Sequence, residues 1–251
     1  MAQALKGKVA LITGAAKRIG RETALTLADE GADIIVHYRS SELEARELVA
    51  ELDAKGVRSW AVQADFESPE ETNSLIERAL AKAGSLDILV NNASIFPSDK
   101  LDNLTFEGLT TNIQVNAWAP FVLMRSFAER VGRGGIVNML DSRVWGYDWT
   151  HVGYILSKHV LTAMTKMAAL QYAPDISVNG IAPGLILPPP GKPEDYIDAL
   201  KDTVPLRKHG DPQEIADAIE YLVKAEFVTG EVIFVDGGRH LKEYLDPARR
   251  P

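Results

Sequence analysis

The chain has 251 residues, 46% of them hydrophobic and 25% charged, a composition typical of an ordinary soluble globular protein. Its formal net charge of −8 argues against nucleic acid as a partner, and the lack of cysteine excludes disulfide bonds and thiolate metal sites or nucleophiles, so no metal site is predicted. No apolar run approaches the roughly 18 residues of a membrane span, and the opening MAQALK is too short for a signal peptide, so we expect a cytoplasmic protein with no membrane partner.

The first apolar run, residues 9–12, leads into a glycine turn and then a helical pattern. A continuous apolar run of this kind is typical of a parallel strand covered on both faces. Thr13-Gly14-Ala15-Ala16-Lys17-Arg18-Ile19-Gly20 follows, and apolar periodicity then indicates a helix that stops at Gly31. Such a turn presents free backbone N–H groups and a helix N-terminus, which suit the pyrophosphate of a dinucleotide.

The second predicted strand, residues 33–37, is followed by Tyr38-Arg39-Ser40-Ser41. An acidic residue at this strand end would accept hydrogen bonds from the adenosine ribose and repel a 2′-phosphate, but none is present. Arg39 and Ser40 instead offer a cation and a hydroxyl, so the sequence favours NADP over NAD. We also expect Ser41 to cap a helix over residues 42–55.

Two further predicted strands end in polar residues. The strand over residues 59–63 ends before Asp65 and Phe66, and Ser68 is the expected cap of the next helix. The strand over residues 87–90 delivers Asn91-Asn92-Ala93-Ser94, and Phe96 follows. An aromatic residue at such a place is either part of the core or a platform on which a flat ligand stacks.

A helical pattern over residues 106–131 contains Asn116 among apolar neighbours, and a buried amide needs hydrogen-bond partners. The next apolar run, residues 136–140, is closed by Asp141. An aromatic-rich loop over residues 142–151 follows, and its rings wall either a flat pocket or a subunit interface.

Tyr154 and Lys158 lie in an apolar-periodic segment at a spacing that places them on one face of a helix. An ammonium close to a phenol lowers the phenol's pKa from about 10 and prepares it for proton transfer near neutral pH. A carboxylate from Asp141 beside Tyr154 would have the opposite effect. If burial keeps Asp141 protonated, Asp141 is itself a second candidate acid.

The last third of the chain adds two strands and a helix. Residues 177–181 predict a strand that delivers Ala182-Pro183-Gly184, Asp211 is the expected cap of a helix, and residues 232–235 predict the final strand. Seven strands that alternate with helices predict a single α/β domain of the Rossmann type. Its doubly wound parallel sheet would carry helices on both faces and ligand sites at the carboxyl ends of the strands.

Together these motifs resemble the short-chain dehydrogenase/reductase (SDR) superfamily over nearly the whole chain. The pattern T-G-x-x-x-G-x-G of that family has Arg18 in place of its middle glycine here, and N-N-A-G ends in Ser94. Both departures, like Phe96, are similar to the pteridine reductase and dihydromonapterin reductase branch. The threonine usual after Pro183-Gly184 is absent, so backbone groups of the next two residues would have to hold the nicotinamide carboxamide.

The resemblance implies the residues of the site. The implied catalytic residues are Asp141, Tyr154, Lys158 and Asn116, the last holding a water beside Lys158 in a proton relay. The implied NADP(H) site comprises Gly14, Lys17, Arg18, Ile19, His37, Tyr38, Arg39, Ser40, Asp65, Phe66, Asn91, Ala93, Ser94, Tyr154, Lys158, Pro183, Gly184, Leu185 and Ile186. The implied substrate-binding residues are Arg18, Ser94, Phe96, Asp141, Trp145 and Tyr154.

Three larger features also follow. The resemblance implies a substrate lid over about residues 185–210 and a homotetramer assembled through the helices that carry Asn116 and Tyr154. We expect residues 246–251 to form a flexible tail.

We therefore predict an NADPH-dependent oxidoreductase that reduces a C=N bond of a pterin, with dihydropterin, dihydromonapterin or dihydrofolate as the open choices of substrate. Carbonyl-reducing members usually carry serine at the position of Asp141, whereas a carboxylate suits the N–H donors of a pterin. The first alternative is a carbonyl reductase for a ketone, a quinone or a 3-oxoacyl-type substrate, with Ser142 in the serine role. The second is a non-catalytic NADPH-binding protein, against which the presence of Tyr154, Lys158 and Asn116 argues.

Overall fold

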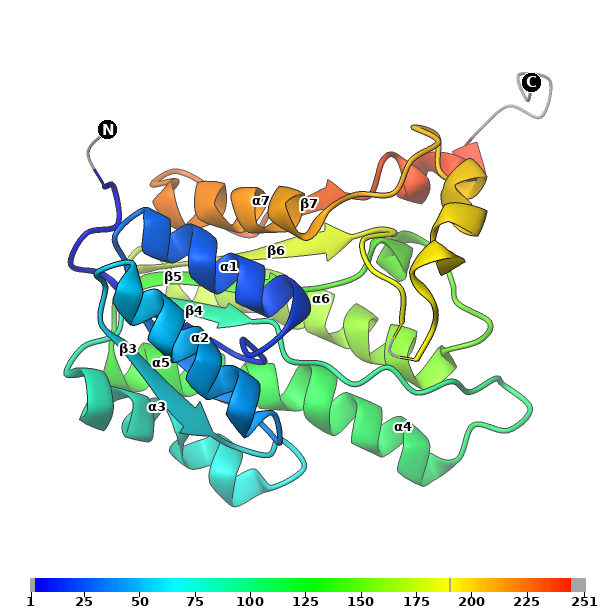
Figure 1. The fold of residues 1–251 in the computed structure, drawn as a ribbon. Helices are drawn as coiled ribbons and strands as arrows, with labels where there is room; N and C mark the ends of the chain where they lie inside the picture. Colours follow the sequence, from blue (N-terminus) through cyan, green and yellow to red (C-terminus); the bar gives the residue numbers. More distant parts are fainter. Residues whose placement is uncertain (1–2, 190, 245–251) are drawn as a thin grey trace.

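Seven parallel strands form one sheet at the centre of the molecule. The computed structural model describes residues 3–189 and 191–244, and its strand order is β3-β2-β1-β4-β5-β6-β7 (Figure 1). The strands are β1 (Val9–Ile12), β2 (Asp33–Tyr38), β3 (Ser59–Gln63), β4 (Ile88–Asn91), β5 (Gly134–Met139), β6 (Ile176–Pro183) and β7 (Val232–Val235). The direction of winding reverses between β1 and β4, so a crevice that can take a ligand is expected outside their carboxyl ends.

Helices cover both faces of the sheet (Figure 1). They are α1 (Arg18–Asp29), α2 (Glu42–Ala54), α3 (Pro69–Ala83), α4 (Phe106–Ile113), α5 (Ala119–Arg130), α6 (Val152–Tyr172) and α7 (Pro212–Lys224). Alternate residues of β1 face the two layers: Val9 and Leu11 pack with α3, α5 and α6, whereas Ala10 and Ile12 pack with α1, α2 and α7. The predicted Rossmann-type fold is therefore confirmed.

The expected helix caps are confirmed at two of three positions. Ser68 Oγ accepts from the N–H of Glu71 at 3.3 Å, and Asp211 Oδ1 accepts from the N–H of Gln213 at 2.8 Å. Ser41 precedes α2 but its side chain makes no capping bond, so that prediction is wrong. Glu42 and Glu44 place negative charge in the first turn of α2 instead, which favours the positive end of the helix dipole.

The helix predicted over residues 106–131 is divided into three parts. Between α4 and α5, residues Gln114–Trp118 form a π-helical turn, η1, in which the N–H of Ala119 donates to the carbonyl of Gln114. Wider turns of this kind are frequent at functional sites. Asn116 lies at the centre of this one.

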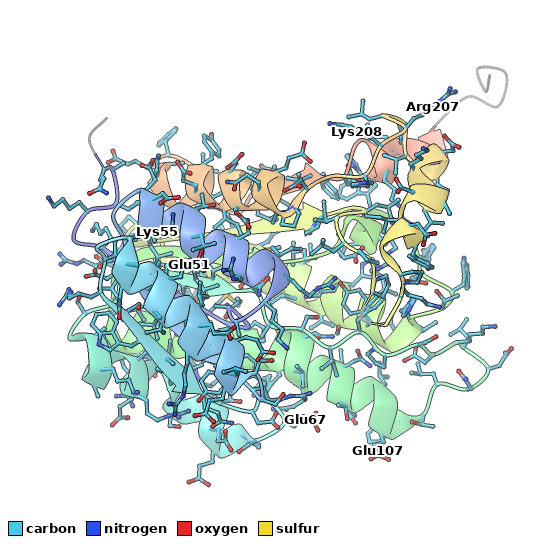
Figure 2. All side chains as sticks on the ribbon, viewed as in Figure 1. Glu51, Lys55, Glu67, Glu107, Arg207 and Lys208 are labelled. Carbon is cyan, nitrogen blue, oxygen red and sulfur yellow. The ribbon has the colours of Figure 1, made fainter. Side chains whose placement is uncertain are left out.

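Residues 185–210, the predicted lid, run along one end of the sheet (gold in Figure 1) and contain the short helices η3 (Glu194–Tyr196) and η4 (Asp198–Thr203). Near the end of the segment the N–H of Leu206 donates to the carbonyl of Gly237, and Arg207 and Lys208 follow there (Figure 2). Pro190 within this segment and the tail predicted over residues 246–251 lie outside the described residues. Within the described ranges, no helix is long and apolar enough to cross a membrane.

Candidate active site

A cavity of about 380 Å³ opens at the carboxyl ends of β1 to β4. It is lined by most of the residues predicted to bind the cofactor: Gly14, Lys17, Arg18, Ile19, His37, Tyr38, Arg39, Ser40, Asp65, Phe66, Ala93 and Ser94. Leu185 and Ile186 line a neighbouring cavity of about 480 Å³ instead. The sequence motifs from four strand ends are thus brought together in space.

The glycine turn is packed so closely that only bare backbone fits. Gly14 has a φ of +63°, and a Cβ on Gly20 would lie 2.4 Å from the Gly14 carbonyl oxygen. Asn92 Nδ2 donates to the carbonyls of Thr13 at 2.8 Å and Gly14 at 3.2 Å, which fixes the turn from the β4 side. Asn92 was not predicted as a site residue, although its place within Asn91-Asn92-Ala93-Ser94 was the available signal.

Asn91, by contrast, does not line the cavity. Its side chain is buried within the sheet, where Nδ2 donates to Asn138 Oδ1 at 2.8 Å. Successive side chains of a strand point to opposite sides, so the two neighbouring asparagines cannot both face a ligand. A contact of Asn91 with the cofactor would therefore have to come from its backbone, and it stays a prediction.

His37 supports the same turn from β2. Its Nδ1 accepts from the N–H of Gly14 at 3.0 Å, so Nε2 carries the proton and donates to the Ala64 carbonyl at 3.1 Å. Burial lowers the pKa of His37 to about 4, which keeps the imidazole neutral as this arrangement requires. The ring stacks on Phe66 with centroids 4.7 Å apart.

Two arginines stand at the mouth of the cavity. Arg39 pairs with Glu67 (labelled in Figure 2) at 3.3 Å, and because both side chains are about half exposed this pair holds Arg39 only weakly. Arg18 has a φ of +58°, a conformation that suits glycine, and its Nη2 donates to the Pro188 carbonyl at 2.8 Å. Arg18 therefore ties the glycine turn to the predicted lid.

The predicted catalytic tyrosine and aspartate are in direct contact. The Tyr154 hydroxyl donates to Asp141 Oδ2 at 3.0 Å, and both side chains are largely buried. Burial raises the pKa of Tyr154 well above its usual value, and the negative charge of Asp141 raises it further. Tyr154 is therefore a protonated donor at neutral pH.

Lys158 does not have the predicted effect on this phenol. Its Nζ is 5.6 Å from the centre of the Tyr154 ring, but it donates to the Met139 carbonyl at 2.7 Å at the end of β5. Burial and the charge of Asp141 raise the pKa of Tyr154 and outweigh any lowering by Lys158, so the lowered pKa expected of this phenol is not found.

Asp141 is held ionised. Burial raises its pKa, but the hydrogen bonds and positive charge of Arg143 outweigh burial and hold the pKa below the usual aspartate value. The hypothesis of a protonated Asp141 is therefore wrong for this arrangement. Arg143 was not predicted as a site residue, and its position two residues after Asp141 was the only signal in the sequence.

Asn116 has protein partners for its whole side chain. Oδ1 accepts from Ser94 Oγ and from the N–H of Ile95, both at 2.9 Å, and Nδ2 donates to Ser157 Oγ at 3.1 Å and to the Ile95 carbonyl at 3.1 Å. The amide thus joins the segment after β4 to α6, next to Tyr154. Its predicted role in holding a water stays a prediction.

Aromatic rings border the Tyr154 hydroxyl. Phe96 meets the Tyr154 ring edge-on at 4.6 Å, His151 stacks on Phe96 at 3.9 Å, and the Arg143 guanidinium carbon lies 5.4 Å from the centre of the Phe96 ring. Trp145 is 55% exposed and contacts Phe234 edge-on at 5.9 Å. Tyr147 and Trp149 are still more exposed, so the two predicted uses of this loop, pocket wall and subunit interface, remain open.

The rate of reduction is expected to fall above a pH of about 8. Burial lowers the pKa of Lys158 to about 8, whereas Tyr154 stays protonated, so raising the pH through this value removes the ammonium first. Lys158→Arg keeps the charge and is expected to move the fall to higher pH. The measurement is kcat/KM against pH for both proteins, and a fall at the same pH in both would contradict the assignment.

Comparison with known proteins agrees with this geometry. A 3-oxoacyl-[acyl-carrier-protein] reductase FabG of Staphylococcus epidermidis is 32% identical over 242 residues, covering 93% of this chain and 99% of the relative. The crystal structure of FolM alternative dihydrofolate reductase 1 from Brucella canis, complexed with NADP, superposes with a TM-score of 0.92 at 29% identity and full coverage of both chains. A blue fluorescent protein from a metagenomic library, in complex with NADPH, gives 0.87 at 33% identity and covers 94% of this chain and 99% of its own.

The parallel sheet, the glycine turn and the Tyr154–Lys158 pair, together with these relatives, define a short-chain dehydrogenase/reductase, and the predicted superfamily is confirmed. Within that superfamily the chain belongs to the family described as Enoyl-(Acyl carrier protein) reductase, whose model matches residues 14–240.

Proposed function

We propose that the protein is an NADPH-dependent reductase of a C=N bond in a dihydropterin. The observation that carries the proposal is the ionised Asp141 carboxylate against the Tyr154 hydroxyl. When a C=N bond gains a hydride at carbon and a proton at nitrogen, positive charge develops at the nitrogen as it is protonated. A ketone instead develops negative charge on oxygen. A nearby carboxylate stabilises the positive charge on the nitrogen and disfavours the negative charge on the ketone oxygen.

The residues that line the cavity at the ends of β1 to β4 fit NADPH. The glycine turn and the N-terminus of α1 line the cavity, and Gly14 and Gly20 let the backbone pack closely there, as suits a pyrophosphate. Arg39 and Ser40 line the cavity at the end of β2 and suit a 2′-phosphate. When bound there, NADPH supplies the hydride. The NADP in the related FolM structure supports this choice.

The protein's own groups divide the remaining work. The Tyr154 hydroxyl, whose hydrogen bonds Asp141 Oδ2 in the free site, turns to the substrate and gives this proton to its nitrogen. Asp141 then stabilises the positive charge at that nitrogen, and the Tyr154 phenolate regains a proton from solvent. Lys158 supplies positive charge beside the phenol from the other side of the ring. Phe96, edge-on to Tyr154, offers one ring face to a planar substrate, where stacking contributes on the order of 1 kcal/mol.

The second candidate is reduction of a carbonyl group, including a 3-oxoacyl substrate. The FabG relatives favour it. Ser142, next to Asp141, is buried, and its hydroxyl has no hydrogen-bond partner among the described residues, so it is the available replacement for the usual serine.

The test is NADPH oxidation, followed by absorbance, with a dihydropterin, 3-oxoacyl thioesters, ketones and quinones at equal concentration. A dihydropterin that exceeds all carbonyl compounds by orders of magnitude in kcat/KM supports the proposal. A faster carbonyl compound would establish the second candidate.

Asp141→Ser is expected to lower kcat/KM for the dihydropterin by about 10²-fold or more, since the carboxylate that orients Tyr154 is lost. NADPH affinity should stay within about threefold, because Asp141 does not line the 380 Å³ cavity that contains the glycine turn. The same kinetic assay, with NADPH binding measured by fluorescence, checks both values. Unchanged turnover of the dihydropterin would remove Asp141 from the mechanism.

We also propose, from the family resemblance, a homotetramer assembled through the segment α4–η1–α5, which carries Asn116, and through α6, which carries Tyr154. Exposed apolar side chains support it: Trp118, Leu156, Met167 and Leu170 are between 41% and 84% exposed in the single chain. The role of residues 185–210 as a lid and the cytoplasmic location stay predictions.

A further inference from the structure

Arg143 grips Asp141 with a bidentate contact. Its Nε donates to Oδ1 at 2.9 Å and its Nη2 to Oδ2 at 2.7 Å, while its own backbone N–H donates to Oδ1 at 2.8 Å. The two residues are separated by one position at the start of η2 (Ser142–Trp145), so the chain doubles back to bring the guanidinium onto the carboxylate. Paired planar groups of this kind form the strongest charged hydrogen bonds.

This bidentate contact leaves the Asp141 carboxylate one acceptor position for another group, and the Tyr154 hydroxyl occupies it. A carboxylate has about four lone-pair sites, two on each oxygen. Oδ1 accepts the two bonds from Arg143 N and Nε, and Oδ2 accepts one from Arg143 Nη2 and one from the Tyr154 hydroxyl. While Arg143 stays in place, Asp141 therefore cannot also accept the N–H groups of a substrate.

Arg143 is itself anchored from a second side. Its Nη1 contacts Asp148 Oδ2, and Asp148 is in turn held by the backbone N–H and hydroxyl of Thr150, each at 2.8 Å, and by His151 Nδ1 at 3.0 Å. The guanidinium carbon also lies 5.4 Å from the centre of the Phe96 ring and 5.7 Å from that of Tyr154. With 21% of its side chain exposed, Arg143 has little freedom to leave.

We propose that Arg143, anchored by Asp148, is a positioning residue of this active site: it keeps Asp141 ionised and aimed at the Tyr154 hydroxyl. The proposal rests on the assignment of Tyr154 and Asp141 under the proposed function. It makes Tyr154 the sole proton donor of the pair and keeps Asp141 as a carboxylate. The substrate is recognised by other groups.

Several charged groups act on Asp141 besides Arg143. Tyr154 and Lys158 approach from α6, and Arg239 approaches from η5 (Arg239–Tyr244). Asp148 and His151 on the same loop are linked to Asp141 through Arg143. Asp148 adds negative charge, whereas Lys158 and Arg239 add positive charge. Without Arg143, the hydrogen bond from Tyr154 remains, and no other group among the described residues makes a bidentate contact with Asp141.

The test is the titration of the Asp141 carboxyl, followed by ¹³C NMR in protein with labelled aspartate and assigned with Asp141→Asn. Arg143→Met keeps the length of the side chain and removes the charge, and we expect it to raise the pKa of Asp141 by about one unit or more. Arg143→Lys keeps the positive charge but cannot make the bidentate contact, so we expect a smaller rise in the pKa of Asp141. Arg46→Met is the matched control, because Arg46 pairs with Glu42 on the exposed face of α2, and it should leave the titration unchanged.

The acid limb of kcat/KM should move upward in parallel with the NMR titration. If Arg143→Met does not fold, the test uses Arg143→Lys. The proposal is overturned if Asp141 titrates at the wild-type pH in the variant that folds. The NMR reading needs no substrate, so a failure of the pterin assignment would leave it intact, and an unmoved titration with normal pterin turnover would reject the role of Arg143 alone.

Discussion

Tyr154→Phe is expected to lower kcat for reduction by about 10³-fold, within the 10²- to 10⁴-fold range that general acid catalysis usually supplies. The change removes one oxygen and nothing else. Tyr154 is 8% exposed, its ring packs edge-on against Phe96 at 4.6 Å, and a phenylalanine ring can keep that contact. The fold and NADPH binding should therefore survive.

The loss should appear in the chemical step and not in cofactor affinity. Single-turnover oxidation of bound NADPH isolates this step, and fluorescence titration measures binding. Tyr221→Phe is the matched control, since Tyr221 is 56% exposed on α7 and far in sequence from every site motif. A Tyr154→Phe protein that keeps more than about a tenth of the wild-type rate would show that another group delivers the proton.

Gly20→Ala is expected to destabilise the protein by about 2–4 kcal/mol and to weaken NADPH binding by at least about tenfold. The new Cβ would lie 2.4 Å from the Gly14 carbonyl oxygen, 2.6 Å from Asn92 Nδ2 and 3.0 Å from the Ala15 Cα. Two of these three are backbone atoms of the glycine turn, so α1 and the turn must move apart.

Gly108→Ala is the control for this prediction. Gly108 is also helical, but its added Cβ would meet only the Thr105 hydroxyl, at 3.2 Å. Alanine is favoured over glycine in a helix by about 1 kcal/mol, so the net change at position 108 should be within about 1 kcal/mol of zero. Urea unfolding and NADPH titration of both variants compare them directly. Equal stabilities for the two proteins would contradict the close packing at Gly20.

The fold was predictable because its main signals are local. Short apolar runs such as residues 9–12 and 232–235 indicate buried parallel strands when segments with helical periodicity lie between them. A parallel sheet then brings the carboxyl ends of these strands to one edge. Most of the cofactor cavity followed from this, since Gly14, Arg39, Asp65 and Ala93 each lie one or two positions after the end of a strand.

What the sequence did not predict depends on geometry beyond period and order. Arg143 reaches Asp141 through an irregular turn that no periodicity describes, and this contact reverses the expected protonation of Asp141. The Lys158 ammonium donates to the Met139 carbonyl, a direction that its place four residues after Tyr154 does not predict. Asn91 ends β4 with its side chain bonded to Asn138 inside the sheet, whereas Asn92 follows the strand and bonds the glycine turn.

The π-helical turn at Gln114–Trp118 has a consequence for how this chain tolerates changes of length. A π turn spaces its hydrogen bonds five residues apart, so it acts as a single-residue insertion into an α-helix, and the side chains before and after it follow registers about 100° apart. Deleting one residue there would leave a regular helix but would rotate α4 relative to α5. Asn116 could then not keep its bonds to the Ile95 N–H and to Ser157 Oγ while both helices keep their packing. Homologous chains that use this amide to join the β4 end to α6 are therefore expected to keep the same number of residues between α4 and α5.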